Sequence, residues 1–325
     1  MLAEKLYNAH QTSQKPNILV IGDLMLDHYI FGTASRLSPE APVPIVNVKN
    51  ENKIIGGAAN VASNLIDLGA NVYLAGITGD DAFGEEIKAI LQTKNIDTNL
   101  ILKDSSRTTT VKTRVIASNH QIVRIDQEDI HDISGIVEDT FYASLYAYVE
   151  QSDIIILSDY NKGLLTPGLS LKIISLCNQL QKKVIVDPKG LDYAKYRGSY
   201  IIKPNRKELA EAAKTDKIHT QADLEQASKV IFTATETDYL IVTLSEDGMA
   251  IITPESCKIL PVIANQVYDV TGAGDTVVAT LAYCIALGFS IEEACTVSNY
   301  AASIVIKHIG SATTTIDEIL TAINN

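Results

Sequence analysis

The sequence has few cysteines, and none of them is placed as a metal ligand would be. The four show no CxxC pair and no zinc-finger spacing, which excludes the common cysteine metal motifs. We therefore expect reduced, mostly structural thiols at Cys177, Cys257, Cys284 and Cys295. The six histidines show no HxxxH spacing either, so no histidine metal site is expected.

Long hydrophobic runs and an excess of positive charge are also lacking. The longest apolar runs are shorter than the roughly 20 residues of a membrane helix, and "MLAEKLYNAHQTSQK" has no signal-peptide core. A net charge of -12 argues against nucleic acid or an anionic membrane as the main partner. A small phosphorylated ligand needs only a few local cations, so it is not excluded. These absences favour a cytoplasmic location.

No segment of the 325 residues separates two domains. There is no internal repeat, no low-complexity tract and no Pro/Gly-rich linker, and the hydrophobic fraction of 46% is that of an ordinary globular protein. Length alone would allow one large α/β domain or two smaller ones. We expect a single domain over 1–325.

Short, nearly continuous apolar runs alternate with helical patterns. The expected strands are residues 17–22, 71–77, 153–159, 183–188, 200–204 and 239–244. Helices are expected at 58–70, with Gly69 as the stop, and at 82–95. This order predicts an α/β fold with a doubly wound, mostly parallel sheet flanked by helices.

Two segments, 41–55 and 108–126, instead alternate polar and apolar residues, and "ASNHQ" (117–121) is typical of a hairpin turn. Half-exposed strands of this kind predict a small β-sheet lid, formed by about 29–55 and 108–126.

Polar residues follow several of the expected strands. Gly22 and Asp23, Ser158 and Asp159, Asp187 to Lys189, and Pro204 and Asn205 all come at strand ends. Ligands of open α/β sheets bind beyond the carboxyl ends of the strands, so a site is expected at this edge.

The stretch "DVTGAGD" (269–275) precedes an apolar helix expected at 275–287 and ended by Gly288. Gly272 and Gly274 let backbone N–H groups turn toward an anion, which the helix N-terminus also favours. Asp275 then has two interpretations: an acid that caps the helix, or a base that takes a proton from a hydroxyl during phosphoryl transfer. No Walker P-loop and no protein-kinase motif set occurs.

Two glycine-rich motifs, taken together, resemble those of a known family. "GGAAN" (56–60) with "DVTGAGDT" (269–276) resembles the paired signatures of the ribokinase (PfkB) family of sugar kinases. "GDLMLDHYIFGTASRLSPEAPVPIV", "IIGGAANVASNLIDLGA", "LSDYNKGLL", "VDPKGLDYAKYRG", "PNRKEL" and "VYDVTGAGDT" resemble its D-glycero-β-D-manno-heptose-7-phosphate kinase branch. The ordered set covers about residues 17 to 315.

The resemblance implies a ribokinase-like fold and an ATP-dependent phosphotransferase. Asp275 would be the catalytic base, and the N–H groups of Gly272, Ala273 and Gly274 would form the anion hole. The acceptor would be the C1 hydroxyl of heptose 7-phosphate, the product the 1,7-bisphosphate, and the pathway ADP-heptose synthesis for lipopolysaccharide core. In the enterobacterial enzyme an adenylyltransferase is fused to the kinase; because this chain ends at Asn325, a stand-alone kinase is expected.

For ATP and Mg²⁺, the resemblance implicates the NxxE motif, Asn205 to Glu208, with Arg206 and Lys207 inside it. Asn205 and Glu208 would help to hold the metal, although the same pair also fits a capping box. The remaining nucleotide residues implied are Thr243, Ser245, Gly248 and Asn299, for which a β turn and a helix amide are the plain alternative. A monovalent cation near Asp269 and Thr271 is known in related kinases.

For the sugar, the resemblance implicates Asp23, Asp27, Gly56, Gly57, Asn60 and Asp159. Carboxylates and amides suit vicinal hydroxyls, but Asp23 could merely end a strand and GGAAN merely start a helix. Candidate ligands of the 7-phosphate are Arg36, Lys112, Arg114, Arg124, Lys162 and Lys189. Each of those on the lid could equally belong to a solvated ribbon face.

Two alternatives to the heptose kinase remain open. One keeps the fold and changes the substrate to another sugar, sugar phosphate or nucleoside. The other is a non-catalytic sugar- or nucleotide-binding regulator, which would not need the acid at 275. The sequence does not fix the anomer at C1. A lid with an unpaired edge favours a homodimer.

Overall fold

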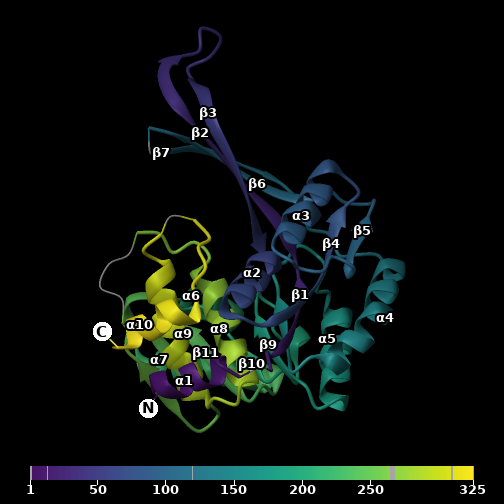
Figure 1. The fold of residues 1–325 in the computed structure, drawn as a ribbon, viewed down its shortest axis with the longest axis vertical. Helices are drawn as coiled ribbons and strands as arrows, with labels where there is room; N and C mark the ends of the chain where they lie inside the picture. The colour runs from purple at the N-terminus through teal and green to yellow at the C-terminus, as the bar shows by residue number, and fades with distance from the viewer. Residues whose placement is uncertain (1, 13, 119, 264–267, 309, 325) are drawn as a thin grey trace.

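The computed structural model describes residues 2–12, 14–118, 120–263, 268–308 and 310–324. Its body is built on a nine-stranded sheet (Figure 1). The strand order is β13 (Cys257–Leu260), β12 (Met249–Ile252), β11 (Tyr239–Thr243), β10 (Ile201–Ile202), β9 (Lys183–Asp187), β8 (Ile154–Ser158), β1 (Asn17–Gly22), β4 (Asn71–Gly79) and β5 (Ile101–Asp104). The pairs from β11 to β5 are parallel, whereas β12 and β13 are antiparallel.

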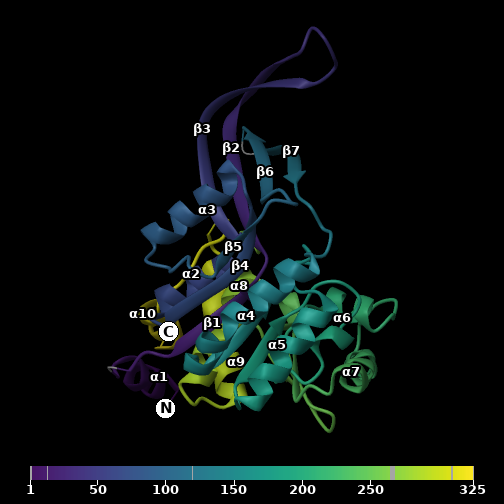
Figure 2. The ribbon, with the colours of Figure 1, turned by 90° about the vertical axis from the view of Figure 1, so that its right-hand side faces the viewer.

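Helices cover both faces of this sheet because its strands are apolar on both sides. In β1, Ile18 and Val20 enter one core while Leu19 and Ile21 enter the other. The first core is shared with α1 (Leu2–His10), α2 (Ala58–Leu68), α3 (Ala82–Thr93), α8 (Ala273–Ala286), α9 (Ile291–Val305) and α10 (Ile316–Asn324). The second is shared with α4 (Gly135–Gln151), α5 (Pro167–Gln179), α6 (Arg206–Ala212) and α7 (Gln221–Thr235) (Figure 2).

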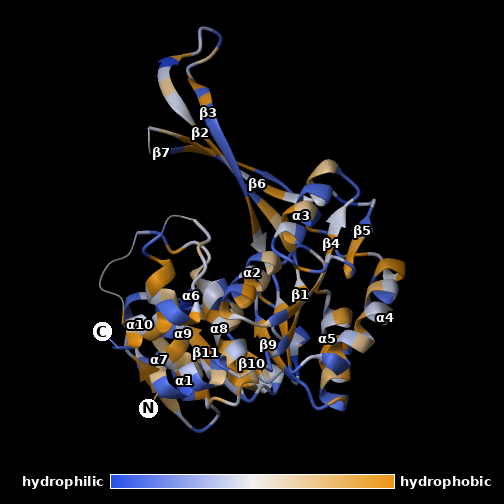
Figure 3. Ribbon diagram, viewed as in Figure 1, coloured by the Kyte–Doolittle hydropathy of each residue, from blue (hydrophilic) through white to orange (hydrophobic). Residues whose placement is uncertain are grey.

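A second sheet projects from the body as a long ribbon (Figures 1 and 2). Its order is β3 (Pro44–Gly57), β2 (Leu24–Leu37), β6 (Thr110–Ala117) and β7 (His120–Gln127). A long stretch of β3 is hydrophilic in Figure 3, and β7 is exposed along its whole length. The expected lid sheet is confirmed. Its first strand along the chain, β2, begins at Leu24, directly after Asp23. Asn119 of the expected turn lies outside the described residues.

The six expected body strands are confirmed as β1, β4, β8, β9, β10 and β11, and the two expected helices as α2 and α3. Gly69 has the left-handed backbone that ends α2 (φ 96°). Three strands were missed: β5, β12 and β13. Each has only four residues, too few to show a period.

Candidate active site

Asp275 lies at the start of a buried helix. Gly272 precedes α8 with a left-handed backbone (φ 78°), and Asp275 is in the first turn with only 5% of its surface exposed. The helix is buried from Asp275 to Ile285, as its apolar sequence predicted. Thr276 fixes the helix start by donating to Asn64 Oδ1 at 2.8 Å. The acid is therefore held on a rigid element.

Two side chains from other elements donate to the Asp275 carboxylate. Asn60 Nδ2, on α2, lies 2.6 Å from Oδ2, and the Tyr160 hydroxyl, after β8, lies 2.6 Å from Oδ1. No side-chain hydrogen bond caps α8 at Gly272. The recorded contacts of the carboxylate thus point toward the sheet edge, which favours the interpretation as a base over that as a cap.

Burial raises the pKa of Asp275, and three neighbours oppose that rise. In decreasing order they are the hydrogen bond from Tyr160, the hydrogen bond from Asn60 and the positive charge of Lys203. Lys203 is itself 3% exposed, follows β10 and pairs with Asp187 at 2.8 Å. A Cβ on Gly274 would lie 3.6 Å from Lys203 Nζ, so this ammonium lies beside the glycine loop.

Sequence reasoning did not assign roles to Tyr160, Lys203 or Asn64. Tyr160 and Lys203 both follow parallel strands, so the rule about strand ends could have flagged them. Asn64 lies one helical turn after Asn60, and its contact with Thr276 spans 212 residues, which no local pattern shows.

Asp23 closes the loop after β8. Its Oδ2 accepts the backbone N–H groups of Tyr160 (2.8 Å) and Lys162 (3.2 Å). Burial, reinforced by the negative charge of Asp159, raises the pKa of Asp23 to about 6. Asp159 Oδ2 accepts from Tyr196 (2.7 Å) and pairs with Lys195 (2.6 Å), while its Oδ1 accepts the Asn161 N–H (2.6 Å), so this carboxylate ties the loop after β8 to buried residues.

The glycines of GGAAN allow β3 to approach these acids. A Cβ on Gly57, whose φ is +61°, would lie 2.4 Å from the carbonyl oxygen of Asp23. A Cβ on Gly56 would lie 2.6 Å from the Asp27 carboxylate. Asp27 pairs with Arg114, whose guanidinium lies 5.3 Å from the Tyr29 ring centroid. Asp23, Asp27, Asn60 and Asp275 thus belong to one connected edge.

Five of the six candidate phosphate ligands are paired with carboxylates. Glu128 is central, because it contacts both Lys162 (2.7 Å) and Lys112 (3.2 Å). The other pairs are Lys112 with Asp126, Arg114 with Asp27, Arg124 with Asp126, and Lys189 with Glu208. Arg36 is exposed on β2, with no ion pair to any residue in the described ranges. The structure therefore brings Lys112 and Lys162 together and leaves Arg36 apart.

The NxxE motif forms a capping box at the start of α6. Asn205 Oδ1 accepts the Glu208 N–H and Glu208 Oε2 accepts the Asn205 N–H, each at 2.9 Å. Glu208 Oε1 also contacts Lys189 Nζ at 2.6 Å. Carboxylate and amide oxygens fit Mg²⁺, which uses one or two carboxylates together with substrate phosphates. Within the described ranges, no group of three or more His, Cys, Asp or Glu residues could hold a metal ion by itself.

Three of the candidate nucleotide residues, Thr243, Ser245 and Gly248, lie next to this motif. The Thr243 N–H donates to the Pro204 carbonyl at 3.1 Å, and Arg206 pairs with Asp247 in the turn that starts at Ser245. Gly248 has φ +94°, and a Cβ there would lie 2.1 Å from the Leu260 carbonyl oxygen. Asn299 lies apart on α9, where its amide nitrogen donates to the Pro261 carbonyl at 3.4 Å. Lys207, inside the motif, is exposed beside Glu211.

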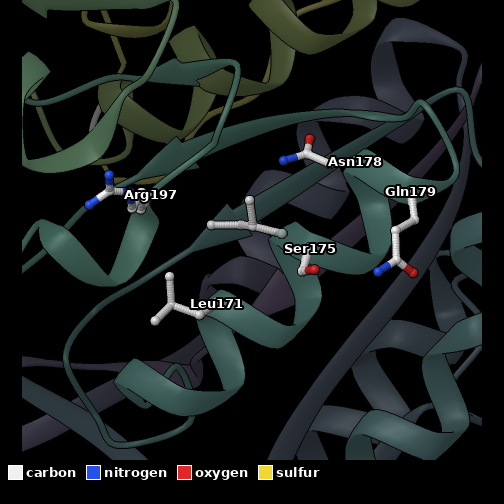
Figure 4. A pocket seen from close by; sticks show the side chains of 6 residues that line it. Leu171, Ser175, Asn178, Gln179 and Arg197 are labelled. Atoms are coloured by element: carbon white, nitrogen blue, oxygen red, sulfur yellow. The ribbon is translucent and has the colours of Figure 1, made fainter.

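A surface pocket of about 540 Å³ lies elsewhere, between α5 and the turn that carries Arg197 (Figure 4). Its residues Asn178 and Gln179 lie at the end of α5, shortly before β9 begins, and therefore at the opposite edge of the sheet from Asp275. It shares no residue with the candidate site.

Across the described ranges, no helix is long and apolar enough to cross a bilayer.

Comparison with known proteins gives the family. Residues 15–318 match the family described as pfkB family carbohydrate kinase. The chain is 46% identical to bifunctional protein HldE of Wolinella succinogenes over 95% of its own length and 65% of that protein. It is also 46% identical to bifunctional protein HldE of Aliarcobacter butzleri, over 94% and 64%. The chain thus spans just under two thirds of these relatives.

Solved structures agree on the fold. Escherichia coli phosphofructokinase-2, in complex with potassium, aligns over 96% of this chain and 99% of its own, with a TM-score of 0.79 and 17% identity. Arabidopsis thaliana ribokinase, complexed with ribose and ATP, covers 96% and 100%, with a TM-score of 0.76 and 20% identity. The chain has a ribokinase-like fold, is a sugar phosphotransferase, and belongs to the pfkB family of carbohydrate kinases.

Proposed function

We propose that this kinase transfers the γ-phosphoryl group of ATP to the C1 hydroxyl of D-glycero-D-manno-heptose 7-phosphate, giving the 1,7-bisphosphate. The resemblance to the heptose kinase branch supports this substrate, and so does the 46% identity to proteins named HldE. The product would enter ADP-heptose synthesis for lipopolysaccharide core. The observation that carries the chemistry is the buried Asp275 at the glycine-rich start of α8.

In this mechanism Asp275 takes the proton of the attacking hydroxyl. The backbone N–H groups of Gly272, Ala273 and Gly274, together with the positive end of α8, would hold the negative charge of the transferring group. Positioning and charge neutralisation supply most of the acceleration in phosphoryl transfer. Asp23, Asp27, Gly56, Gly57, Asn60 and Asp159 would form the sugar-binding edge.

The 7-phosphate would bind Lys112, Arg114, Arg124, Lys162 and Lys189. The carboxylate partners of Lys112, Arg114, Arg124 and Lys162 lie on the lid strands or directly after them, and the more highly charged phosphate would replace those contacts. Lys189 would instead have to leave Glu208, at the start of α6. Lys112 and Lys162 support this most directly, because one carboxylate already draws both ammonium groups together.

ATP would lie along Asn205 to Glu208, Thr243, Ser245, Gly248 and Asn299. Bound Mg²⁺ would neutralise charge on the phosphates, and Asn205 and Glu208 would help to hold it. Asp269 fixes the loop before α8 by accepting the N–H groups of Thr271 and Gly310, both at 2.9 Å. We place a monovalent cation near this loop; rates measured in potassium and in tetramethylammonium salts test it.

We also propose a cytoplasmic homodimer joined through the lid. The apolar side chains Ile122, Val123 and Ile125 of β7 are exposed, and Ile125 is 56% exposed. Such an edge is commonly covered by a second copy. Light scattering of wild type and Ile125→Lys tests it: a dimer that the substitution converts to monomer is expected, and a wild-type monomer contradicts it.

A substrate panel tests the function. ADP release is measured with ATP, Mg²⁺ and heptose 7-phosphate of each C1 anomer, unphosphorylated heptose, fructose 6-phosphate, ribose and a nucleoside, and phosphorus NMR locates the new phosphate. Turnover with heptose 7-phosphate and a phosphate at C1 are expected. Turnover only with another sugar would contradict heptose 7-phosphate as the substrate. Sugar or ATP binding without any phosphoryl transfer would favour a non-catalytic regulator.

A further inference from the structure

Tyr160 joins the sugar-binding edge to the proposed base. Its backbone N–H donates to Asp23 Oδ2 at 2.8 Å, while its hydroxyl donates to Asp275 Oδ1 at 2.6 Å. The Lys162 N–H adds a second bond to the same Asp23 oxygen, so the loop is fixed on both sides of residue 161. The position of the Tyr160 ring is therefore determined before any ligand binds.

The direction of the bond between Tyr160 and Asp275 is clear. Burial, and then the negative charge of Asp275, raise the pKa of Tyr160 well above 10, so its hydroxyl stays protonated and donates. Asn60 can only donate through its amide nitrogen. Both Asp275 oxygens thus accept a hydrogen bond from an uncharged donor.

These two donors act where burial and nearby acids oppose ionisation of Asp275. The charged groups that face Asp275 are Lys203 after β10, Asp187 at the end of β9 and Asp27 on β2. The two acids and burial oppose ionisation of Asp275, while Lys203 favours it and is itself shared with Asp187. Hydrogen bonds to the charged form of a carboxyl favour that form. Tyr160 and Asn60 therefore carry a large part of what keeps the carboxylate ionised.

We infer that Tyr160 is a positioning residue that keeps the proposed base ionised and aims its carboxylate at the acceptor hydroxyl. The inference rests on the proposed function, because it requires Asp275 to be the base. Tyr160 occupies one lone pair of Oδ1 and Asn60 one of Oδ2, which leaves one lone pair on each oxygen to receive the proton from the sugar. Its proposed role is exerted through the carboxylate of Asp275.

The test is the pH dependence of kcat/KM for Tyr160→Phe between about pH 5 and pH 9, the range where an essential base shows its acid limb. Hydrogen bonds to charged groups are strong enough to move that limb by about one pH unit toward higher pH when the donor is removed. We expect about a tenfold loss on the acid side, and recovery toward the wild-type value at the alkaline end. A loss by the same factor at every pH would show a merely structural role and overturn the inference.

Tyr196→Phe is the matched control. Its hydroxyl is also buried and donates to a carboxylate, but that carboxylate is Asp159. The acid limb should stay in place in this variant. If the acid limb of Tyr196→Phe moved as far as that of Tyr160→Phe, the loss of any buried hydroxyl would explain the shift, and the inference would be contradicted.

A second substitution keeps the test valid if Tyr160→Phe does not fold. Site-specific 3-fluorotyrosine at position 160 retains the ring and is a stronger donor, so the acid limb should move toward lower pH. An unmoved limb overturns the inference. Asp275→Asn separates this inference from the proposed function. Full turnover in Asp275→Asn would show that Asp275 is not the base and would contradict both. If Asp275→Asn is inactive but the acid limb is unmoved in both Tyr160 variants, only the role of Tyr160 is contradicted.

Discussion

Asp275 is held in an environment that opposes and supports its charge at once. Burial disfavours the carboxylate, whereas the helix N-terminus, two uncharged donors and Lys203 favour it. A desolvated base is more strongly basic than one in water, and its fixed position removes the need to reorganise during the reaction. These properties follow from three distant segments that meet at the sheet edge.

The two glycines before Asp275 should respond differently to alanine. Gly272→Ala must keep a left-handed backbone, and its Cβ would lie 3.1 Å from Asn60 Nδ2; we expect the free energy of unfolding to fall by about 1–2 kcal/mol, with a loss of turnover. Gly274 lies inside α8 with room for a Cβ, so Gly274→Ala should retain stability or gain up to about 1 kcal/mol. Denaturant unfolding and steady-state rates measure both. Equal destabilisation by the two substitutions would contradict the assigned backbone geometry.

At the scale of elements, the lid base is an ion-pair network that a substrate phosphate would reorganise. Glu128→Gln frees Lys112 and Lys162 from their shared carboxylate. We expect the KM for a sugar phosphate to fall by about two- to fivefold, the size expected for partly exposed ion pairs. The KM for ATP should not change.

Glu138→Gln is the control for that prediction, because Glu138 also holds a lysine, Lys172, but on α4 and α5 of the body. It should leave both KM values unchanged. If Glu128→Gln raised the KM for the sugar phosphate, or left it unchanged, the phosphate would not bind at Lys112 and Lys162.

Much of the element order could be predicted, because buried parallel strands have continuous apolar sequences that end in polar residues. Asp23 and Asn205 were placed at one edge by that rule, whereas Asp275 was found from the glycine-rich start of an apolar helix. The hydrogen bonds to Asp275 could not be predicted, since Tyr160 and Asn60 lie 115 and 215 residues away and only tertiary packing brings them to this carboxylate. The antiparallel edge of the sheet was also missed, because four-residue strands give no periodic signal.

At the scale of the whole molecule, the buried acids make stability depend on pH. Burial, the largest cause for each, raises the pKa values of Asp23 and Asp187 to about 6 in the folded protein. The folded state then binds more protons than the unfolded state between about pH 4 and pH 6, so these two groups lower the free energy of unfolding as pH rises through that window, by about 2 kcal/mol each.

Asp23→Asn should remove its share of that slope, since the amide oxygen can still accept an N–H group but does not titrate in this range. Urea unfolding at a series of pH values measures the difference between wild type and variant. Asp67→Asn, at an exposed position, should leave the slope unchanged. A wild-type slope in Asp23→Asn would show that this carboxyl is not buried as described.

The most direct test of the central claim is the rate of ATP-dependent sugar phosphorylation by Asp275→Asn. The asparagine keeps the shape of the side chain and cannot take the proton, so we expect kcat to fall by about 10²- to 10⁴-fold, as for the loss of a general base. ATP binding and the unfolding midpoint should stay close to wild type. Turnover at the wild-type rate would show that Asp275 is not the base.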